Sequence, residues 1–432
     1  MRPNILYINS HDTGRYVQPY GHAVPTPTIQ ALAEEGVLFR QAFCAAPTCS
    51  PSRAALLTGC YPHQNGMIGL AHRGFRLHDP GRHLAHTLRK AGYFTALAGV
   101  QHVIEGDRVS ELGYDVILAG DRQSAHSAAA EFFPDPGSRQ PFYLEVGFPQ
   151  THRVFPKLGP EDRPQYCAPP AILPDTPETR LDFARFKASA RMLDEKIKTV
   201  LDALDRNGLR DNTLVICTTD HGIAFPQMKC NLTDHGIGVM LIMRGPGVEV
   251  PGRAIDAMVS HIDIYPTLCE LLEIDPPDWL EGVSLVPLLN GEDREVRKEV
   301  FAEVTYHAAY EPMRCIRTKR HKYIRRFDDR ATPVLPNCDE GETRDLWLAN
   351  GWKDRPVEQE QLFDLLFDPM ERDYLAGDAK SQPILTDMRR QLQDFMVRTT
   401  DPLLCGPVSA SSGARLNDPD DVSPNDPVFV VK

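Results

Sequence analysis

Apolar runs that end in polar side chains recur along the first half of the chain. Strands buried on both faces of a parallel sheet give near-continuous apolar stretches, which occur here at residues 4–9, 94–100, 142–148 and 213–219. A further strand is predicted at residues 239–243. The pattern therefore predicts a large α/β domain with a parallel sheet, which we expect to extend over residues 1–300.

Helical spacing is clearest between Leu181 and Arg206, where Asn207-Gly208 ends the apolar run. Shorter helices are predicted at residues 28–35, 83–91 and 262–272. Residues 104–140 show no clear period, so we predict no element there. The many prolines at residues 154–180 indicate a surface loop that could shape access to a site.

The pattern changes after residue 300. Residues 313–317 and 321–325 alternate like two strands of an antiparallel hairpin, and a helix at 384–397 would cover one face of that sheet. We therefore predict a C-terminal α+β subdomain over residues 301–404. Residues 405–432, rich in Pro, Asp, Ser and Gly, cannot build a core, and we expect an extended tail that wanders or packs on another subunit.

Composition narrows the class of protein. The 432 residues are 42% hydrophobic and 25% charged, as in an ordinary globular protein. A net charge of −12 without a Lys/Arg-rich tract argues against a nucleic-acid binder, so any anionic substrate must be held by local positive charge. We find no run of apolar residues long enough to cross a membrane. The ten cysteines lack paired spacing, which favours a reducing compartment, and we expect a cytoplasmic protein.

Polar side chains follow the predicted strands at the point where each strand ends. Since open α/β sheets bind ligands at the carboxyl ends of their strands, these side chains should meet at one edge. Asp and His are typical ligands of divalent metals, so the convergence predicts a metal site with a nucleophile beside it. The residues concerned are His11, Asp12, Cys49, His102, His152, Asp220 and His221.

Cys49 lies in an unusual local setting. Pro47 and Pro51 bracket a turn, and Ser52 is a suitable N-cap for a helix over residues 53–57. Cys49 would then lie just ahead of a helix N-terminus, whose unpaired N–H groups favour anions. The alternative is an inert, buried cysteine, which is the usual state of a free thiol.

The stretch Cys49-Ser50-Pro51-Ser52-Arg53 resembles the sulfatase signature Cys-x-Pro-x-Arg. Other motifs similar to those of sulfatases of the alkaline phosphatase superfamily follow in the expected order over about residues 3–400, and they most resemble heparan N-sulfatases and arylsulfatases. This resemblance implies an alkaline phosphatase-like sandwich, in which helices flank a large, mostly parallel sheet and a smaller antiparallel sheet follows. The matching stretches are 4–12, 63–70, Gly99-x-x-His102, Thr151-His152-Arg153, Thr219-Asp220-His221-Gly222, Lys229 and Leu362-Phe363-Asp364-Leu365-x-x-Asp368-Pro369.

The resemblance also implies a mechanism. A formylglycine-generating enzyme would convert Cys49 to formylglycine, and one oxygen of the hydrated aldehyde would attack sulfur and displace the alcohol. Proton loss from the second hydroxyl would then expel sulfate and restore the aldehyde. One divalent metal ion would be coordinated by His11, Asp12, Asp220 and His221 and also by the hydrate formed from Cys49.

Further roles are implied for the residues around the nucleophile. Arg53 would steady the aldehyde hydrate. Lys229 and His152 would bind the sulfuryl oxygens and help the leaving oxygen depart. His102 would be the base for the last step, and Asn65 would bind a non-bridging oxygen.

The chain departs from the sulfatase pattern at three places. His11-Asp12 replaces two adjacent aspartates, His221 replaces an asparagine, and Val100 replaces a lysine. Because imidazoles replace oxygen ligands, the set favours Mn²⁺, Zn²⁺ or iron over Ca²⁺, the family alternative. The Asp220-His221 pair instead resembles phosphonate monoester and phosphodiester hydrolases of the same superfamily.

A second Asp-His-Gly sequence begins at Asp234. It follows a turn-like segment rather than a strand, so we assign the metal to the copy at Asp220. We interpret the other histidines outside the motifs as structural, and these are His22, His72, His78, His83, His86 and His235.

Three readings of function remain open on the sequence alone. The first is a metal-dependent hydrolase of small sulfate monoesters, whether aryl, alkyl or sugar sulfates, or of N-sulfoglucosamine. The second keeps the same site but cleaves phosphonate monoesters or phosphodiesters. The third is a scaffold that binds anions without turnover, and it requires an unmodified Cys49. In each case we expect a homo-oligomer without nucleic-acid or membrane partners.

Overall fold

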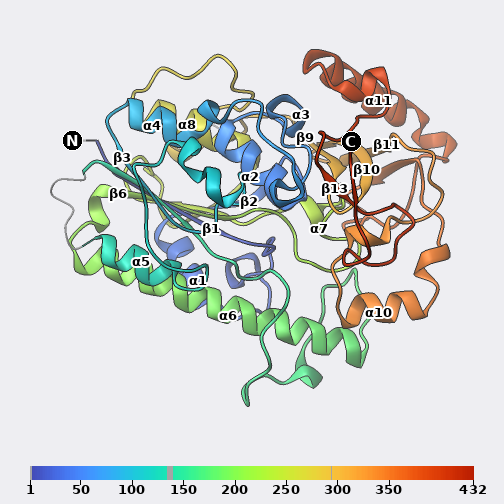
Figure 1. The fold of residues 1–432 in the computed structure, drawn as a ribbon, viewed down its shortest axis with the longest axis horizontal. Helices are drawn as coiled ribbons and strands as arrows, with labels where there is room; N and C mark the ends of the chain where they lie inside the picture. The colour runs from blue at the N-terminus through green and yellow to red at the C-terminus, as the bar shows by residue number, and fades with distance from the viewer. Residues whose placement is uncertain (1, 134–139, 293) are drawn as a thin grey trace.

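The fold is built on a central eight-stranded sheet in a computed structural model that describes residues 2–133, 140–292 and 294–432 (Figure 1). The strand order is β4-β3-β5-β1-β6-β7-β2-β8, and neighbours run parallel except on either side of β7. The strands are β1 (Asn4–Ser10), β2 (Val37–Phe43), β3 (Phe94–Gly99), β4 (Val116–Ile117), β5 (Phe142–Gly147), β6 (Thr213–Thr219), β7 (Leu241–Arg244) and β8 (Arg253–Ser260).

β1 lies near the middle of this sheet, between β5 and β6. Ile5 pairs with Tyr143 on one side and with Leu214 on the other. Every residue of β1 and β6 is buried, as the continuous apolar runs predicted for strands covered on both faces. The parallel pairing brings the carboxyl ends of β1 and β6 to the same edge.

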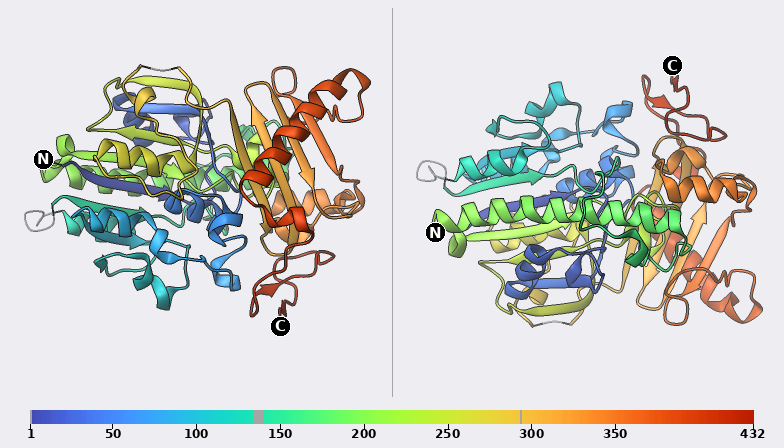
Figure 2. Two further views of the ribbon diagram at one scale, coloured as in Figure 1. Left: turned by 90° about the horizontal axis from the view of Figure 1, so that it is seen from above. Right: turned by 90° about the horizontal axis from the view of Figure 1, so that it is seen from below.

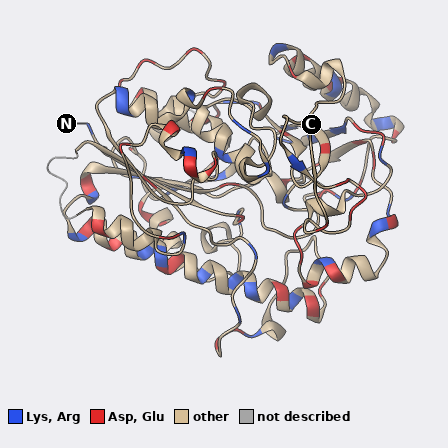
Figure 3. Cartoon of the chain, viewed as in Figure 1, with Lys and Arg blue, Asp and Glu red and all other residues tan. Residues whose placement is uncertain are grey.

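Helices cover both faces of the sheet, which confirms the predicted sandwich (Figure 1). One face carries α1 (Pro27–Glu35), α5 (Ala125–Phe132) and α6 (Pro177–Arg206). The opposite face carries α2 (Cys49–Thr58), α4 (Leu84–Lys90) and α8 (Ile264–Leu271). The Thr176 hydroxyl caps α6, and charged residues of both signs run along this helix (Figure 3).

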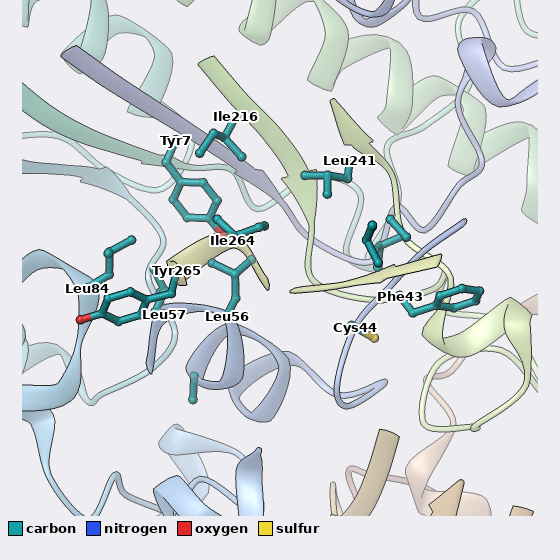
Figure 4. Packing of buried hydrophobic residues seen from close by; sticks show 14 of the residues in the cluster. Tyr7, Phe43, Cys44, Leu56, Leu57, Leu84, Ile216, Leu241, Ile264 and Tyr265 are labelled. Carbon is teal, nitrogen blue, oxygen red and sulfur yellow. The ribbon is translucent and has the colours of Figure 1, made fainter. Parts of the chain in front are cut away.

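The core between the sheet and α2 holds that helix in place. Tyr7 of β1 and Ile216 of β6 face the side of the sheet on which Leu56, Leu57 and Ile264 pack (Figure 4). All of these side chains are at most 2% exposed. Because close-packed side chains resist displacement, this packing fixes the N-terminus of α2 relative to the strand ends.

A four-stranded antiparallel sheet follows, with strand order β12-β11-β10-β9. Figure 2 shows it at one end of the larger sheet, with α11 running across it. α11 packs on β10 and β11, as the sequence predicted. The elements are β9 (Glu299–Tyr306), β10 (Tyr310–Thr318), β11 (His321–Arg326), β12 (Glu360–Asp364), α10 (Glu342–Ala349) and α11 (Gln382–Arg398).

The remaining short elements are the helices α3 (Pro62–Asn65), α7 (Asp234–Ile237) and α9 (Val286–Leu289) and the strands β13 (Arg415–Leu416) and β14 (Phe429–Val430). None of the described helices is both long and apolar enough to cross a bilayer. All ten cysteines are free. These observations test neither the cytoplasmic location nor the homo-oligomer, so both stay predictions.

Three local predictions were wrong. Residues 104–140 contain β4 and α5, which the alanine-rich sequence of α5 concealed, although 134–139 lie outside the described residues. α2 begins at Cys49, so Ser52 lies inside the helix, where its hydroxyl donates to the Asp220 carbonyl instead of acting as N-cap. The tail packs on its own chain, with Ala414 and Leu416 buried in the main core.

Candidate active site

Five side chains meet where β1, β6 and α2 come together. His11 and Asp12 directly follow β1, and Asp220 and His221 directly follow the neighbouring strand β6. Cys49 is the first residue of α2. One ligand atom from each of these five buried residues lies within 4.8 Å of those of the others. The structure therefore brings together all of the metal ligands predicted from the sequence.

Short distances link the members of this cluster. The His11 Nδ1 atom lies 2.7 Å from Asp12 Oδ1 and 3.2 Å from Asp220 Oδ2. His221 Nε2 lies 3.3 Å from both Asp12 Oδ1 and Cys49 Sγ. Asp12 is fully buried with a φ of 54°, and its backbone N–H donates to Asp220 Oδ1. The two strand ends are therefore connected directly through backbone and side chain.

Arg53, on α2, binds the cluster through the Asp220 carboxylate. It is 1% exposed, and its Nε lies 3.1 Å from Asp220 Oδ2 while Nη2 donates to the Ser10 carbonyl. Burial alone would raise the pKa of Asp220, but His11, His221 and Arg53 hold that pKa below its usual value. Asp220 is therefore an ionised carboxylate that can accept a cation.

Lys229 contacts two carboxylates and one imidazole at the edge of the five-residue cluster. Its Nζ lies 2.9 Å from Asp12 Oδ2, 2.9 Å from Asp339 Oδ2 and 3.4 Å from His152 Nε2. Burial would lower the pKa of Lys229, yet Asp12 and Asp339 raise it well above the usual value. The ammonium group is therefore a fixed positive charge next to the five-residue cluster.

Two of the histidines near the cluster, His11 and His102, are held in their neutral form. Burial lowers the pKa of His11 to about 4, although Asp220 and Asp12 oppose that shift. Burial also lowers the pKa of His102 well below its usual value. The ring of His11 lies 5.5 Å from that of His102 and 4.7 Å from that of His152. A neutral imidazole can ligate a metal or accept a proton.

A cavity of about 1060 Å³ opens onto these histidines. It reaches His11, His102 and His152, and its other walls come from the strand ends, the proline-rich loop and α6. The prediction that residues 154–180 shape access holds for Val154 and Pro156, which line this cavity. The side chain of His152 is 37% exposed, so it lies between the buried cluster and the solvent.

Asn65 does not have the environment predicted for a substrate ligand. Its amide nitrogen donates to Thr58 Oγ1 and to the Cys60 carbonyl, and its oxygen accepts from the Met67 N–H. The residue is 2% exposed and is not among those that line the cavity. The Asn65 side chain therefore holds the loop after α2 together in this structure, and its role as a substrate ligand stays a prediction.

Sequence reasoning missed three residues near the site. Asp339 contacts Lys229 but lies in a C-terminal segment without periodicity. The ring of His72 stacks on that of His102, with a hydrogen bond of 3.0 Å between Nδ1 and Nε2. Burial lowers the pKa of His307, and Lys229 adds to that shift. Only the fold brings these residues to the site, so no sequence signal could have found them.

The second Asp-His-Gly sequence packs directly against the first. The Gly222 N–H donates to the Gly236 carbonyl, and a side chain at Gly222 would meet the His235 carbonyl at 2.0 Å. Asp234 is bound by Arg317 and Lys322. Because these two cations already bind the Asp234 carboxylate, the contacts agree with our assignment of the metal to the sequence that begins at Asp220.

The donor set of the cluster suits a divalent cation. Three carboxylates, from the buried Asp12 and Asp220 and the partly buried Asp339, face the two buried cations Arg53 and Lys229. The sum of these charges is negative, and His11 and His221 offer ring nitrogens to the same cluster. His63, Glu303 and Asp401 form a second group of this kind, but Arg314 already binds the Asp401 carboxylate and lies 3.9 Å from that of Glu303. The cluster around Cys49 therefore fits a metal ion.

Comparison with known proteins agrees with this geometry. Residues 3–274 match the family model described as "Sulfatase", and residues 228–339 match "N-sulphoglucosamine sulphohydrolase, C-terminal". Human N-sulphoglucosamine sulphohydrolase is 29% identical over 94% of this chain and 92% of its own length. An ulvan-active sulfatase of Formosa agariphila is 30% identical over 91% of this chain and 80% of its own.

Solved structures share the fold. A 2-O GAG sulfatase has a TM-score of 0.73 at 22% identity and covers 95% of both chains. The phosphonate monoester hydrolase of Agrobacterium radiobacter has a TM-score of 0.72 at 22% identity, over 95% of this chain and 100% of that one. The family model covers more than half of the chain, and the 30% identical relative covers most of it. The chain therefore belongs to the sulfatase family and is a sulfuric ester hydrolase.

Proposed function

We propose that the protein hydrolyses sulfate monoesters of saccharides with a formylglycine at position 49 and one divalent metal ion. The observation that carries this proposal is the position of Cys49. Its Sγ lies at the first residue of α2 and 3.3 Å from His221 Nε2, inside the cluster that can hold a metal. Sugar sulfates are favoured as substrates because the names of several relatives, including the human and Formosa proteins, refer to sulfated saccharides.

An unmodified cysteine suits this position poorly as a nucleophile. Burial raises the pKa of the Cys49 thiol well above its usual value, and Asp12 and Asp220 add to that shift although Lys229 opposes it. The thiol would therefore be neutral. A formylglycine hydrate in its place would supply two hydroxyl groups on one carbon, made nucleophilic by the metal when it is bound. The modification requires a formylglycine-generating enzyme as a partner.

The residues around this point have distinct tasks. Lys229 directs an ammonium group at the position where sulfuryl oxygens would lie, and Asp12 and Asp339 hold it there. His152 lies at the cavity wall, where it can donate a proton to the departing oxygen. His102 is neutral and lines the same cavity, so it can accept a proton at an imidazole nitrogen. Arg53 fixes the Asp220 carboxylate.

Mn²⁺ or Zn²⁺ is the proposed metal. Two of the five ligating residues are histidines, and nitrogen ligands suit these ions better than Ca²⁺, which prefers oxygen. His11 and His221 would therefore hold the metal through nitrogen, while Asp12 and Asp220 neutralise its charge.

Hydrolysis of phosphonate monoesters or phosphodiesters is a second candidate function. The Asp220-His221 pair and the fold shared with the Agrobacterium enzyme favour it. Both kinds of substrate are monoanions, but a sulfate would present three non-bridging oxygens to Lys229 and the metal, whereas a phosphonate monoester or phosphodiester would present two and carry a further organic substituent.

Steady-state kinetics with nitrophenyl sulfate and with a nitrophenyl ester of phenylphosphonate test the proposal on the metal-loaded protein. We expect the larger kcat/KM for the sulfate. A sulfate rate lower by orders of magnitude would overturn the choice in favour of the second candidate. The Lys229→Ala variant should lose activity on both esters, while the exposed Lys319→Ala variant serves as the matched control.

A further inference from the structure

The C-terminal tail closes one side of the active-site cavity. Leu416 and Asn417 are buried, and the Asn417 N–H donates to the Ala308 carbonyl. Arg73 Nη1 donates to Asn417 Oδ1 at 2.9 Å. β13 and β14 pair through Arg415 and Leu416. These contacts fix the tail against the loops that surround the site rather than leave it free.

This docking places Arg415 at the cavity. Its Nη2 donates to the His72 carbonyl at 2.5 Å, and the His72 ring stacks on that of His102. Arg415 lines the same cavity as His102 and His152, and its positive charge contributes to the lowered pKa of His72. A guanidinium from the last 20 or so residues therefore reaches the wall of a site built by the N-terminal domain.

Arg122 is a second guanidinium on that wall. It precedes α5, is exposed and lines the cavity next to Gln123. Among the described residues, no carboxylate lies within ion-pair distance of Arg122 or Arg415. Arg153, which also lines the cavity, is by contrast held by both oxygens of Asp182. Arg122 and Arg415 are therefore free to bind an incoming anion.

The charge around the cavity differs from that of the whole chain. The net charge of the protein is −12, yet Glu105 is the only acidic residue among the described ones that line this cavity. The volume of about 1060 Å³ lies at the upper end of the range of about 300–1,000 Å³ that is common for small-molecule sites. A sulfate group at the metal cluster would leave most of this space for the rest of the substrate.

We propose that Arg122 and Arg415 bind a second anionic group of the substrate, a carboxylate or a further sulfate on the sugar next to the one that is cleaved. The substrate is then a polyanionic saccharide of at least two sugar units. This inference rests on the proposed function, since it places the cleaved sulfate at Cys49. It assigns the tail a role in substrate recognition.

Two matched saccharides test this inference. The first is a disaccharide with one sulfate and a carboxylate on the neighbouring ring, and the second is the corresponding monosulfated monosaccharide. Binding is measured by calorimetry in a Cys49→Ala background, so that no turnover is required. We expect Arg415→Gln and Arg122→Gln each to weaken disaccharide binding on the order of tenfold, and monosaccharide binding far less. Arg390→Gln, an exposed arginine on α11, is the control that should change neither.

The dependence on salt gives an independent readout. Disaccharide binding to the Cys49→Ala protein should weaken as salt rises, and the Arg415→Gln protein should show a smaller slope. Equal losses for both saccharides, or no loss, would overturn the inference. Failure of the proposed function has a different signature, because the wild-type protein would then release sulfate from neither saccharide while the binding experiment still reports on Arg122 and Arg415.

Discussion

Asp339 Oδ2 lies 2.9 Å from Lys229 Nζ, so the C-terminal part of the chain supplies a carboxylate to the active site. Lys229 follows the β6 strand end, whereas Asp339 follows the hairpin of the smaller sheet. The C-terminal part of the chain is therefore connected to the candidate active site through an ion pair, in addition to the packing of its sheet against the larger domain.

Asp339→Asn should misplace the Lys229 ammonium group. The amide keeps the shape of the side chain but removes the charge, so Asp12 would be the one carboxylate still paired with Lys229 among the described residues and would draw it toward the proposed metal ligands. We expect kcat/KM for nitrophenyl sulfate to fall on the order of 10- to 100-fold. Asp345→Asn, with a side chain that is 73% exposed, is the control. An Asp339→Asn protein with wild-type kinetics would show that the ion pair is incidental.

His221→Asn should change which metal the site retains. Replacing an imidazole by an amide oxygen favours a harder cation, so the variant should retain less Mn²⁺ or Zn²⁺ and relatively more Ca²⁺. Metal content after dialysis against an equimolar mixture, measured by plasma mass spectrometry, gives the result. His78→Asn, outside the cluster, should match wild type. Wild-type protein that retains calcium alone would contradict the proposed ligand chemistry.

Asp401→Asn should destabilise the smaller sheet. Asp401 and Arg314 are each 1% exposed and form two side-chain hydrogen bonds. Because removing one partner leaves a buried charge, we expect the free energy of unfolding to fall by about 3–5 kcal/mol. Asp387→Asn, on the exposed face of α11, should cost less than about 0.5 kcal/mol. A similar small loss for Asp401→Asn in urea unfolding would refute this account.

Glu371 should make stability depend on pH. Burial raises the pKa of Glu371 from 4.5 to about 7, and Asp234 adds to the shift while Lys322 opposes it. The folded state therefore binds this proton more tightly than the unfolded state, so its contribution to stability falls as pH rises from 4.5 to about 7.

Glu371→Gln removes this titration. The free energy of unfolding of the wild type minus that of Glu371→Gln should decrease between about pH 5 and about pH 7.5, the range in which the Glu371 carboxyl titrates. Above that range the difference should level off. Urea unfolding at several pH values measures it. Glu358→Gln, for which no ion pair is found among the described residues, is the control. A difference that stays constant or rises with pH would contradict the sign of the effect.

The metal cluster could be predicted because it depends on local rules. Asp12 and Asp220 directly follow continuous apolar runs, and parallel strands must bring such ends to one edge of a sheet. The helix at Cys49 was misplaced by a few residues. Ser52 looked like an N-cap, but its hydroxyl instead binds the Asp220 carbonyl, a contact across more than a hundred positions that no local pattern contains.

The C-terminal contributions could not be predicted for the same reason. Asp339 and Arg415 lie in segments without hydrophobic periodicity, and each reaches the site through the packing of the smaller sheet and the tail. A motif resemblance suggested Asn65 as a substrate ligand but did not predict the hydrogen bonds by which its side chain holds the loop after α2. Local sequence therefore pointed to the proposed nucleophile and metal ligands, and tertiary packing determines their surroundings.

Mass spectrometry of the tryptic peptide spanning residues 41–53, from protein made in a host with a formylglycine-generating enzyme, tests the central claim most directly. The peptide contains both Cys44 and Cys49, so Cys44 serves as an internal standard for thiol alkylation. Our account predicts that Cys44 is alkylated, whereas residue 49 has lost its sulfur and two hydrogens, gained one oxygen and reacts with an aldehyde reagent. A peptide in which both cysteines are alkylated, from protein that is nevertheless fully active, would contradict it.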